Sequence, residues 1–236
     1  MFRHIANSWL LVFAAIPTPV LADCVILLHG LARTSNSMEE MAKAFNTAGY
    51  QVANVSYPSR EATIEELAPA AIEAGLEQCP EDESIHFVTH SLGGILVRYY
   101  LEQEEIQDLG KVVMLAPPNQ GSQVTDKLRD NYFYQILNGP AGDQLGTDED
   151  SLVMQLGVVD FPLGIIAGTK SVNPLLSQLL PNPDDGKVSV ENTKVEGMTD
   201  FVELPHSHTF MMRAEDVIEQ AIAFIQHGAF DPQETD

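Results

Sequence analysis

The sequence predicts an α/β domain in which a mostly parallel sheet is covered by helices on both faces. Short apolar runs alternate with longer helical segments, a pattern typical of parallel strands joined by crossover helices. The 236 residues suit one sizeable domain, and no linker-like stretch divides them. In residues 84–94, SIHFVTHSLGG, an apolar run stops and a helical segment follows within a few residues, as at a strand-to-helix turn.

Each element is read from its hydrophobic pattern. Apolar, β-rich runs predict strands at Cys24 to Leu28, Gln51 to Val55, Ile85 to Val88, Lys111 to Leu115, Gly164 to Ala167 and Phe201 to Leu204. Helical periodicity predicts helices at Ser37 to Thr47, Ile64 to Cys79 (rich in Ala and Glu), Ile95 to Gln103 and Ala214 to Gln226. Strands and helices therefore alternate as far as Leu115, and a helix closes the chain after the last predicted strand.

One long irregular stretch interrupts this alternation between Leu115 and Gly164. It holds an aromatic cluster around Phe133 and a polar, glycine-rich run at 138–151. Long loops in compact domains are usually functional covers or carry small helices. We expect residues 119–162 to form a cap whose apolar side chains, Phe133 among them, contact the substrate; the alternative is packing at one sheet edge.

The N-terminus has the three-part form of a secretory signal. Arg3 precedes an apolar run from Trp9 to Ile16, and small residues lead to Ala22. The run is shorter than the roughly 20 residues of a spanning helix. We expect cleavage after Ala22, leaving a domain at 23–236 that is secreted or periplasmic and not stably inserted in a membrane. An uncleaved anchor and lipidation at Cys24 are the alternatives.

The chain contains two cysteines, Cys24 and Cys79. In an oxidising compartment a disulfide between them would tie the first strand to the segment leading into the third, whereas the alternative is two buried thiols.

The composition is strongly acidic, with 34 Asp and Glu against 12 Lys and Arg and a formal charge of −22. Such a surface disfavours nucleic acid and anionic bilayers as partners. The acids are spread along the chain, which also fits a simple adaptation for solubility.

Ser91 is the candidate nucleophile because it sits in the turn at His90-Ser91-Leu92-Gly93-Gly94. The turn would expose its hydroxyl above the sheet edge, next to the amides of a new helix. Gly93 meets the need for a small residue on the helical side, but Thr89 stands where the G-x-S-x-G pattern has glycine. An ordinary turn with a surface serine is the alternative.

The first strand ends in His29-Gly30-Leu31, which supplies a second part of the site. The amides of Leu31 and Leu92 are the candidate donors to an oxyanion. His29 and His90 are candidate substrate contacts, with structural roles as the alternative.

Five segments in this order resemble small secreted bacterial lipases and esterases of the α/β-hydrolase fold: LLHGL, THSLGG, PPNQGS, DDGKVSV and SHTFMM. Asn119 stands where these lipases often have histidine. The resemblance implies a minimal version of the fold that lacks the first two strands, because the chain reaches the His29 strand almost at once.

The resemblance also implies the family order of serine, acid and histidine. Asp185 in the D-G turn is the candidate acid, with Asp184 as its rival. His208, followed by T-F-M, is the candidate base, with His206 as its rival.

We therefore expect a secreted serine hydrolase that cleaves small-molecule or lipid carboxylic esters through an acyl-enzyme on Ser91. No zinc or EF-hand motif occurs in the sequence, so no metal or cofactor is expected. The alternatives are an acyltransferase that uses the same acyl-enzyme and a non-catalytic binding protein on the same fold. The oligomeric state stays open.

Overall fold

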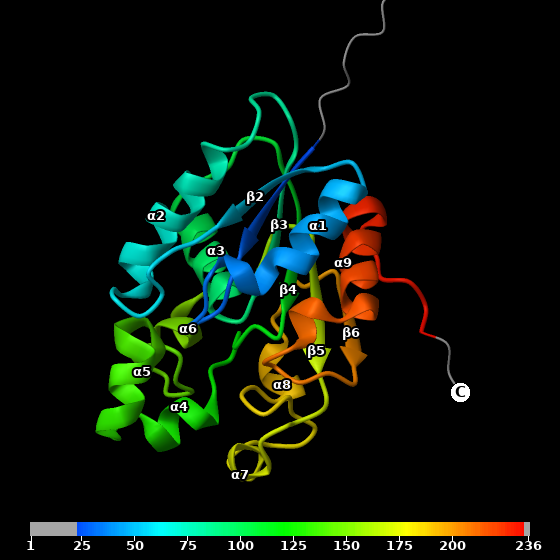
Figure 1. Cartoon of the computed structure of the whole chain (residues 1–236). Coiled ribbons are helices and arrows are strands. Elements are labelled where there is room, and N and C mark those ends of the chain that lie inside the picture. The colour runs from blue at the N-terminus through cyan, green and yellow to red at the C-terminus, as the bar shows by residue number, and fades with distance from the viewer. Residues whose placement is uncertain (1–22, 234–236) are drawn as a thin grey trace, which may run out of the picture.

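Six parallel strands form the centre of the fold in a computed structural model that describes residues 23–233, apart from the side chains of residues 133 and 134 (Figure 1). The strand order is β2-β1-β3-β4-β5-β6. The strands are β1 (Cys24–Leu28), β2 (Gln51–Val55), β3 (Ile85–His90), β4 (Leu109–Leu115), β5 (Leu163–Gly168) and β6 (Asp200–Leu204). The predicted parallel sheet is confirmed, while the expected export signal at 1–22 lies outside the described residues.

Helices cover both faces of the sheet (Figure 1). On one face lie α2 (Ile64–Leu76) and α3 (Leu92–Gln103), and on the other α1 (Glu39–Thr47) and α9 (Glu215–His227). Side chains of β1 alternate between the two cores: Ile26 and Leu28 face the first, and Val25 and Leu27 the second. The strands β1, β3 and β5 are therefore buried along their whole length, whereas the edge strands β2 and β6 keep polar, exposed positions.

The order of the strands reverses between β1 and β3. From β1 the chain adds β2 on one side and then returns to place β3 on the other side. Crevices outside the carboxyl ends of strands at such a switch point are the usual binding sites of open α/β sheets. The turns that follow β1 and β3, with Leu31 and Ser91, meet at this point.

Several element boundaries differ from expectation. Strand β3 continues to His90 because Thr89 and His90 pair with Met114 and Leu115 of β4. Helix α3 begins at Leu92, three residues before the predicted start, since the two glycines that weaken the helix signal are helical here. The first predicted helix is divided into a 3-10 turn, η1 (Ser35–Met38), and α1, and α2 ends at Leu76 instead of Cys79.

The crossover from β4 to β5 contains helices that the periodicity did not predict. These are α4 (Gln123–Leu128), α5 (Tyr132–Asp143) and α6 (Leu152–Gln155). The crossover from β5 to β6 adds α7 (Pro174–Ser177) and α8 (Val190–Thr193), and η2 (Met211–Arg213) precedes α9. Helices α4, α5, α7 and α8 lie at the end of the molecule to which the arrows of β5 and β6 point (Figure 1).

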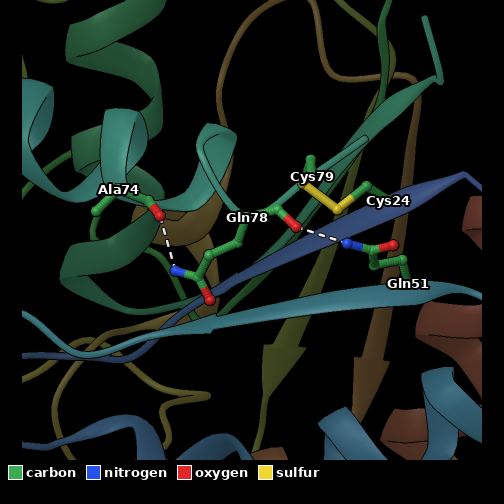
Figure 2. Close-up of a disulfide and its surroundings, with 5 residues drawn as sticks. All are labelled: Cys24, Gln51, Ala74, Gln78 and Cys79. Atoms are coloured by element: carbon green, nitrogen blue, oxygen red, sulfur yellow. Dashed lines mark hydrogen bonds between the residues drawn. A yellow bond between two sulfur atoms is a disulfide. The ribbon is translucent and has the colours of Figure 1, made fainter. Parts of the chain in front are cut away.

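A disulfide joins Cys24 at the start of β1 to Cys79 after α2, as predicted (Figure 2). The two Cα atoms are 5.7 Å apart. Beside the disulfide, the side-chain amide of Gln51 donates to the backbone carbonyl of Gln78 at 2.6 Å (Figure 2). The side-chain amide of Gln78 donates to the backbone carbonyl of Ala74 at 2.7 Å. The bond closes a loop of 55 residues, for which the chain-entropy model gives about 4 kcal/mol of stabilisation.

Among residues 23–233 there is no helix whose length and apolar character suit a membrane span.

Candidate active site

Ser91 occupies a strained backbone position between β3 and α3. Its φ is 52° and its ψ is −119°, a conformation that residues with a Cβ rarely adopt. The Ser91 amide donates to the Leu115 carbonyl at 2.9 Å, which fixes the turn to β4. Ser91 therefore lies at the N-terminus of a 12-residue helix, where the helix dipole favours negative charge.

Glycines allow the backbone to pass close to this turn. A Cβ on Gly93 would come within 2.7 Å of the Leu28 carbonyl oxygen, and one on Gly30 within 2.7 Å of His90 Nδ1. Thr89, which replaces the usual glycine, is fully buried, and its hydroxyl donates to the Val113 carbonyl at 3.4 Å. A Cβ on Gly94 would lie 3.2 Å from that hydroxyl, so the missing side chain of Gly94 makes room for Thr89.

A chain of hydrogen bonds links Ser91, His208 and Asp185. His208 Nε2 lies 3.0 Å from Ser91 Oγ, and His208 Nδ1 lies 2.7 Å from Asp185 Oδ2. The other carboxylate oxygen of Asp185 accepts from the amides of Lys187 at 2.9 Å and Val188 at 2.8 Å. The carboxylate thus has three donors, and it fixes the proton of His208 on Nδ1 so that Nε2 can accept from the serine.

The two rivals of these residues have other partners. Asp184 accepts from the Gly186 amide at 2.7 Å and from the Ser177 hydroxyl, so it stabilises the turn that carries Asp185. His206 Nε2 lies 2.7 Å from both carboxylate oxygens of Asp216, at the start of α9. Neither side chain is hydrogen-bonded to Ser91 or His208.

His90 contacts His208 through a hydrogen bond and through its ring. Its Nε2 donates to the His208 carbonyl at 2.9 Å, and the two ring centroids are 4.7 Å apart. Burial holds the pKa of His90 well below its usual value, and the charges of His208, Lys187 and Arg33 lower it further. The ring is therefore neutral, and its buried Nδ1 has no hydrogen-bond partner among the described residues.

His29 is not at the cavity. Its ring is fully buried, stacks on Tyr57 with 4.1 Å between centroids, and accepts from the Tyr57 amide at 3.3 Å. The Tyr57 hydroxyl donates back to the His29 carbonyl. These contacts hold the turn after β1 in place. They favour a structural role for His29 over direct contact with a substrate.

The Leu31 turn is held from the neighbouring strand. The Ala32 amide donates to Ser59 Oγ at 3.1 Å, while the Leu31 amide makes no hydrogen bond with the described residues. The Leu92 amide is the first of α3 and has no acceptor within the helix. Both amides are thus available to a ligand.

A cavity of about 500 Å³ opens at Ser91 and His208. Its apolar wall includes side chains from the β4–β5 crossover, namely Val124, Leu128, Leu137 and Leu145, together with Leu176 and Val188. His90 also borders it, whereas the Phe133 side chain lies outside the described residues. The volume and the mainly apolar lining are those of a small-molecule site.

Arg98 on α3 holds both ends of the segment that carries α4 to α6. Its guanidinium donates to the carbonyl and the side-chain oxygen of Asn119, each at 3.1 Å, and to the carbonyls of Leu156 and Gly157 at 3.2 and 3.0 Å. Burial lowers the pKa of Arg98 to about 10, and Glu102 opposes that shift. The side chain therefore stays charged at neutral pH.

Sequence reasoning missed the residues that support the site from neighbouring elements. Tyr57 and Ser59 follow β2, which is the neighbour of β1, and strand order alone could have suggested them. Asn119 was noted only as a departure from lipases. No group of His, Cys, Asp and Glu side chains within 23–233 could hold a metal ion.

Parallel strands in this order, with a serine turn after β3 and a hydrogen-bonded acid and histidine after β5 and β6, define the α/β-hydrolase fold. The sequence model of the palmitoyl protein thioesterase family matches residues 24–152. The chain belongs to this family, and the match includes Ser91 but ends before Asp185 and His208.

Solved structures of lipolytic and thioesterase enzymes share the fold. The mature form of the Bacillus licheniformis lipase BlEst2 superposes with a TM-score of 0.66 at 18% identity, over 91% of this chain and 94% of the lipase. The phospholipase PlaB from Legionella pneumophila gives 0.67 at 20% identity, over 85% of this chain and 57% of that protein. YbtT, a type II thioesterase of the yersiniabactin pathway, gives 0.61 at 13% identity, over 91% and 96%.

No curated protein sequence matches the chain.

Proposed function

We propose that the protein is a secreted serine hydrolase that cleaves carboxylic esters through an acyl-enzyme on Ser91. The observation that carries this proposal is the hydrogen-bonded chain from Asp185 through His208 to Ser91 at the edge of an apolar cavity. In this reaction His208 Nε2 takes the proton of the serine hydroxyl as Oγ attacks the carbonyl carbon. Asp185 keeps the imidazole in the required tautomer and stabilises its cation.

The amides of Leu31 and Leu92 are the proposed donors to the oxyanion that forms on the carbonyl oxygen. One such donor typically contributes about 10²–10³ in kcat. His208 then gives its proton to the leaving alcohol, and water repeats the sequence on the acyl-enzyme to release the acid. Residues 119–162 are the proposed cap, because four of their apolar side chains form the cavity wall.

Secretion is supported by the disulfide, which requires an oxidising compartment, and by the signal-like residues 1–22. The cavity of about 500 Å³ favours esters of short to medium acyl chains over long-chain triglycerides.

Thioester cleavage is a second candidate, favoured by the match to the palmitoyl protein thioesterase family. The same nucleophile and oxyanion donors would serve it, with a thiol as the leaving group. Oxygen and sulfur esters of one acyl chain, compared by kcat/KM, distinguish the two substrates. Added alcohol in the same assay detects acyl transfer as an alternative to hydrolysis.

The test of the mechanism is labelling by a fluorophosphonate followed by peptide mapping. We expect the label on Ser91, and we expect Ser91→Ala to lose both the label and ester turnover by several orders of magnitude. Ser122→Ala is the matched control, because Ser122 also lines the cavity but its hydroxyl donates to the Lys187 carbonyl at 2.6 Å instead of meeting a histidine. Label on any other serine, or turnover by Ser91→Ala, contradicts the mechanism.

A further inference from the structure

The polar lining of the active-site cavity has the opposite charge to the rest of the protein. Arg33, Arg60 and Lys187 line it, and no Asp or Glu is among the residues that line it in the described chain. The whole sequence has 34 acids against 12 bases, so a lining of average composition would contain mostly acids. The cations are concentrated at the one place where a substrate meets the serine.

These three cations are not used to stabilise the fold. Within residues 23–233, Lys43, Arg129 and Lys194 are in ion pairs with acids, whereas Arg33, Arg60 and Lys187 are in none. Other cations such as Lys127, Lys170 and Arg213 are in no ion pair either, but they do not line the cavity. The side chains of Arg33, Arg60 and Lys187 make no hydrogen bond in the described structure either. Arg33 is half-buried, and the other two are exposed. Three unpaired charges around an apolar cavity are free to bind an anion.

Two of the cations flank the groups that we propose to be reactive. Arg33 lies two residues after the Leu31 amide, and Lys187 lies two residues after Asp185 and donates its own amide to that carboxylate. Lys187 is open to the solvent of the cavity but has protein on several sides, and this desolvation lowers its pKa. The charge of Arg33 lowers the pKa further, and Asp185 opposes the shift. Both charges also act on His90, whose ring packs on His208.

The proposed mechanism, together with the neighbourhood of Lys187 and Asp185, indicates which half of the substrate the charges would meet. His208 gives its proton to the leaving group, so the leaving group lies on the side of His208. The acyl chain has the apolar wall of Val124, Leu128 and Leu145 as its natural place. An anion beside Arg33 and Lys187 would therefore belong to the alcohol or thiol half, not to the end of the acyl chain.

We propose that Arg33 and Lys187, with Arg60 at the rim, form a subsite for an acidic group, phosphate or carboxylate, on the leaving half of the substrate. This proposal rests on the proposed hydrolase function. Arg and Lys are the usual partners of both groups, Arg through two parallel hydrogen bonds and Lys as a point charge. The subsite also offsets the repulsion that the acidic surface exerts on an anionic substrate.

The experiment compares matched esters that share one octanoyl chain. The leaving halves are glycerol, glycerol phosphate and glycerate, which are neutral, phosphorylated and carboxylated. A fourth substrate, the glycerol monoester of octanedioic acid, keeps the neutral leaving half and places the carboxylate at the acyl end. We expect kcat/KM to be at least about tenfold higher for the two esters with an acidic leaving half than for the glycerol ester. Two partly exposed charge contacts supply an effect of that size.

The variants are Arg33→Gln, Lys187→Gln and the double variant, with Lys43→Gln on α1 as the control cation. We expect the ratio of anionic to neutral kcat/KM to fall towards one in the double variant, to be kept by Arg33→Lys, and to be unchanged in Lys43→Gln. The wild-type ratio should also fall as salt rises from low concentration to 0.5 M. Fluorophosphonate labelling of Ser91 in every variant shows that the site is intact.

Failure of this proposal and failure of the hydrolase function give different results. If glycerol octanoate is cleaved as well as its anionic partners, or if the double variant keeps the preference, the anion subsite is wrong while the hydrolase stands. A preference for the octanedioate monoester would place the anion at the acyl end and overturn the proposal. If Ser91→Ala cleaves all four esters, the hydrolase function itself is wrong.

Discussion

Replacing Asp185 by Asn tests the role of the acid with almost no change in shape. One oxygen of Asp185 accepts from two backbone amides, Lys187 and Val188, and the other accepts from His208 Nδ1. Asparagine has one acceptor and one donor group. Because the two fixed amides require an acceptor, the asparagine oxygen should face them and its NH₂ group should face His208.

The NH₂ group then requires an acceptor at His208 Nδ1, so the ring proton moves to Nε2. Nε2 becomes a donor towards Ser91 Oγ, 3.0 Å away, and can no longer take the serine proton. The same exchange in serine proteases lowers kcat by about 10⁴, which corresponds to about 5.5 kcal/mol of lost transition-state stabilisation. Two of the three hydrogen bonds keep their geometry, so the melting temperature should change little.

The assay is steady-state hydrolysis of a short-chain p-nitrophenyl ester, with the rate of fluorophosphonate labelling as a second reading of serine reactivity. Asp184→Asn is the matched control, because Asp184 is equally buried in the same turn but contacts Gly186 and Ser177 instead of the histidine. We expect the control to lose less than tenfold. Activity of Asp185→Asn within tenfold of wild type, or an equal loss in Asp184→Asn, would refute this account of the triad.

Three further predictions concern stability. Arg98→Met should lower the free energy of unfolding by about 3–5 kcal/mol, measured with urea, because it leaves buried carbonyls without donors; a loss below 1 kcal/mol contradicts the role given to this side chain. Serine at both Cys24 and Cys79 should cost about 4 kcal/mol, and equal stability of reduced and oxidised wild type would oppose that value. Burial lowers the pKa of His29, His86 and His90, so the unfolded chain binds more protons than the native one. The contribution of these histidines to the free energy of unfolding should therefore be fully present above pH 6.5 and be lost as the pH falls below it. His90→Gln should make the free energy of unfolding depend less steeply on pH in this acidic range. An unchanged pH dependence would exclude His90 as a contributor.

The fold could be predicted well from the sequence because the inner strands are buried on both faces. A short apolar, β-rich run such as CVILL between turn signals is typical of a core strand, and the helices between the strands keep their apolar periodicity. The disulfide followed from the signal-like N-terminus. The predictions that were wrong concern element boundaries and short helices. The glycines after Ser91 weaken the helix signal in the first turn of α3, and four-residue helices such as α6 and α7 are too short to show a helical periodicity.

The site could be predicted only in part, for a geometric reason. Ser91 is predicted from its strand-to-helix turn, and Asp185 and His208 from the resemblance to small lipases. The choice between Asp184 and Asp185 depends on which side chain faces the histidine, and that depends on backbone directions in the turn. For His29 the structure favours the structural alternative, which the sequence could not decide because its partner Tyr57 lies in the loop after β2. Nothing in the sequence relates Arg33 to Lys187 of the DDGKVSV segment, and only the folded structure places both at the same cavity.

The Arg98 contacts mark the two ends of the segment between Asn119 and Gly157, and they separate this segment from the rest of the domain. The guanidinium fastens the chain at Asn119 and again at Leu156 and Gly157, while Ser91, Asp185 and His208 all lie outside that span. A different insert between the two fastening points would meet the same anchor and leave the reacting groups where they are. We therefore expect that grafting a related segment between these two points would change which substrates fit the cavity, while Ser91, Asp185 and His208 keep their positions.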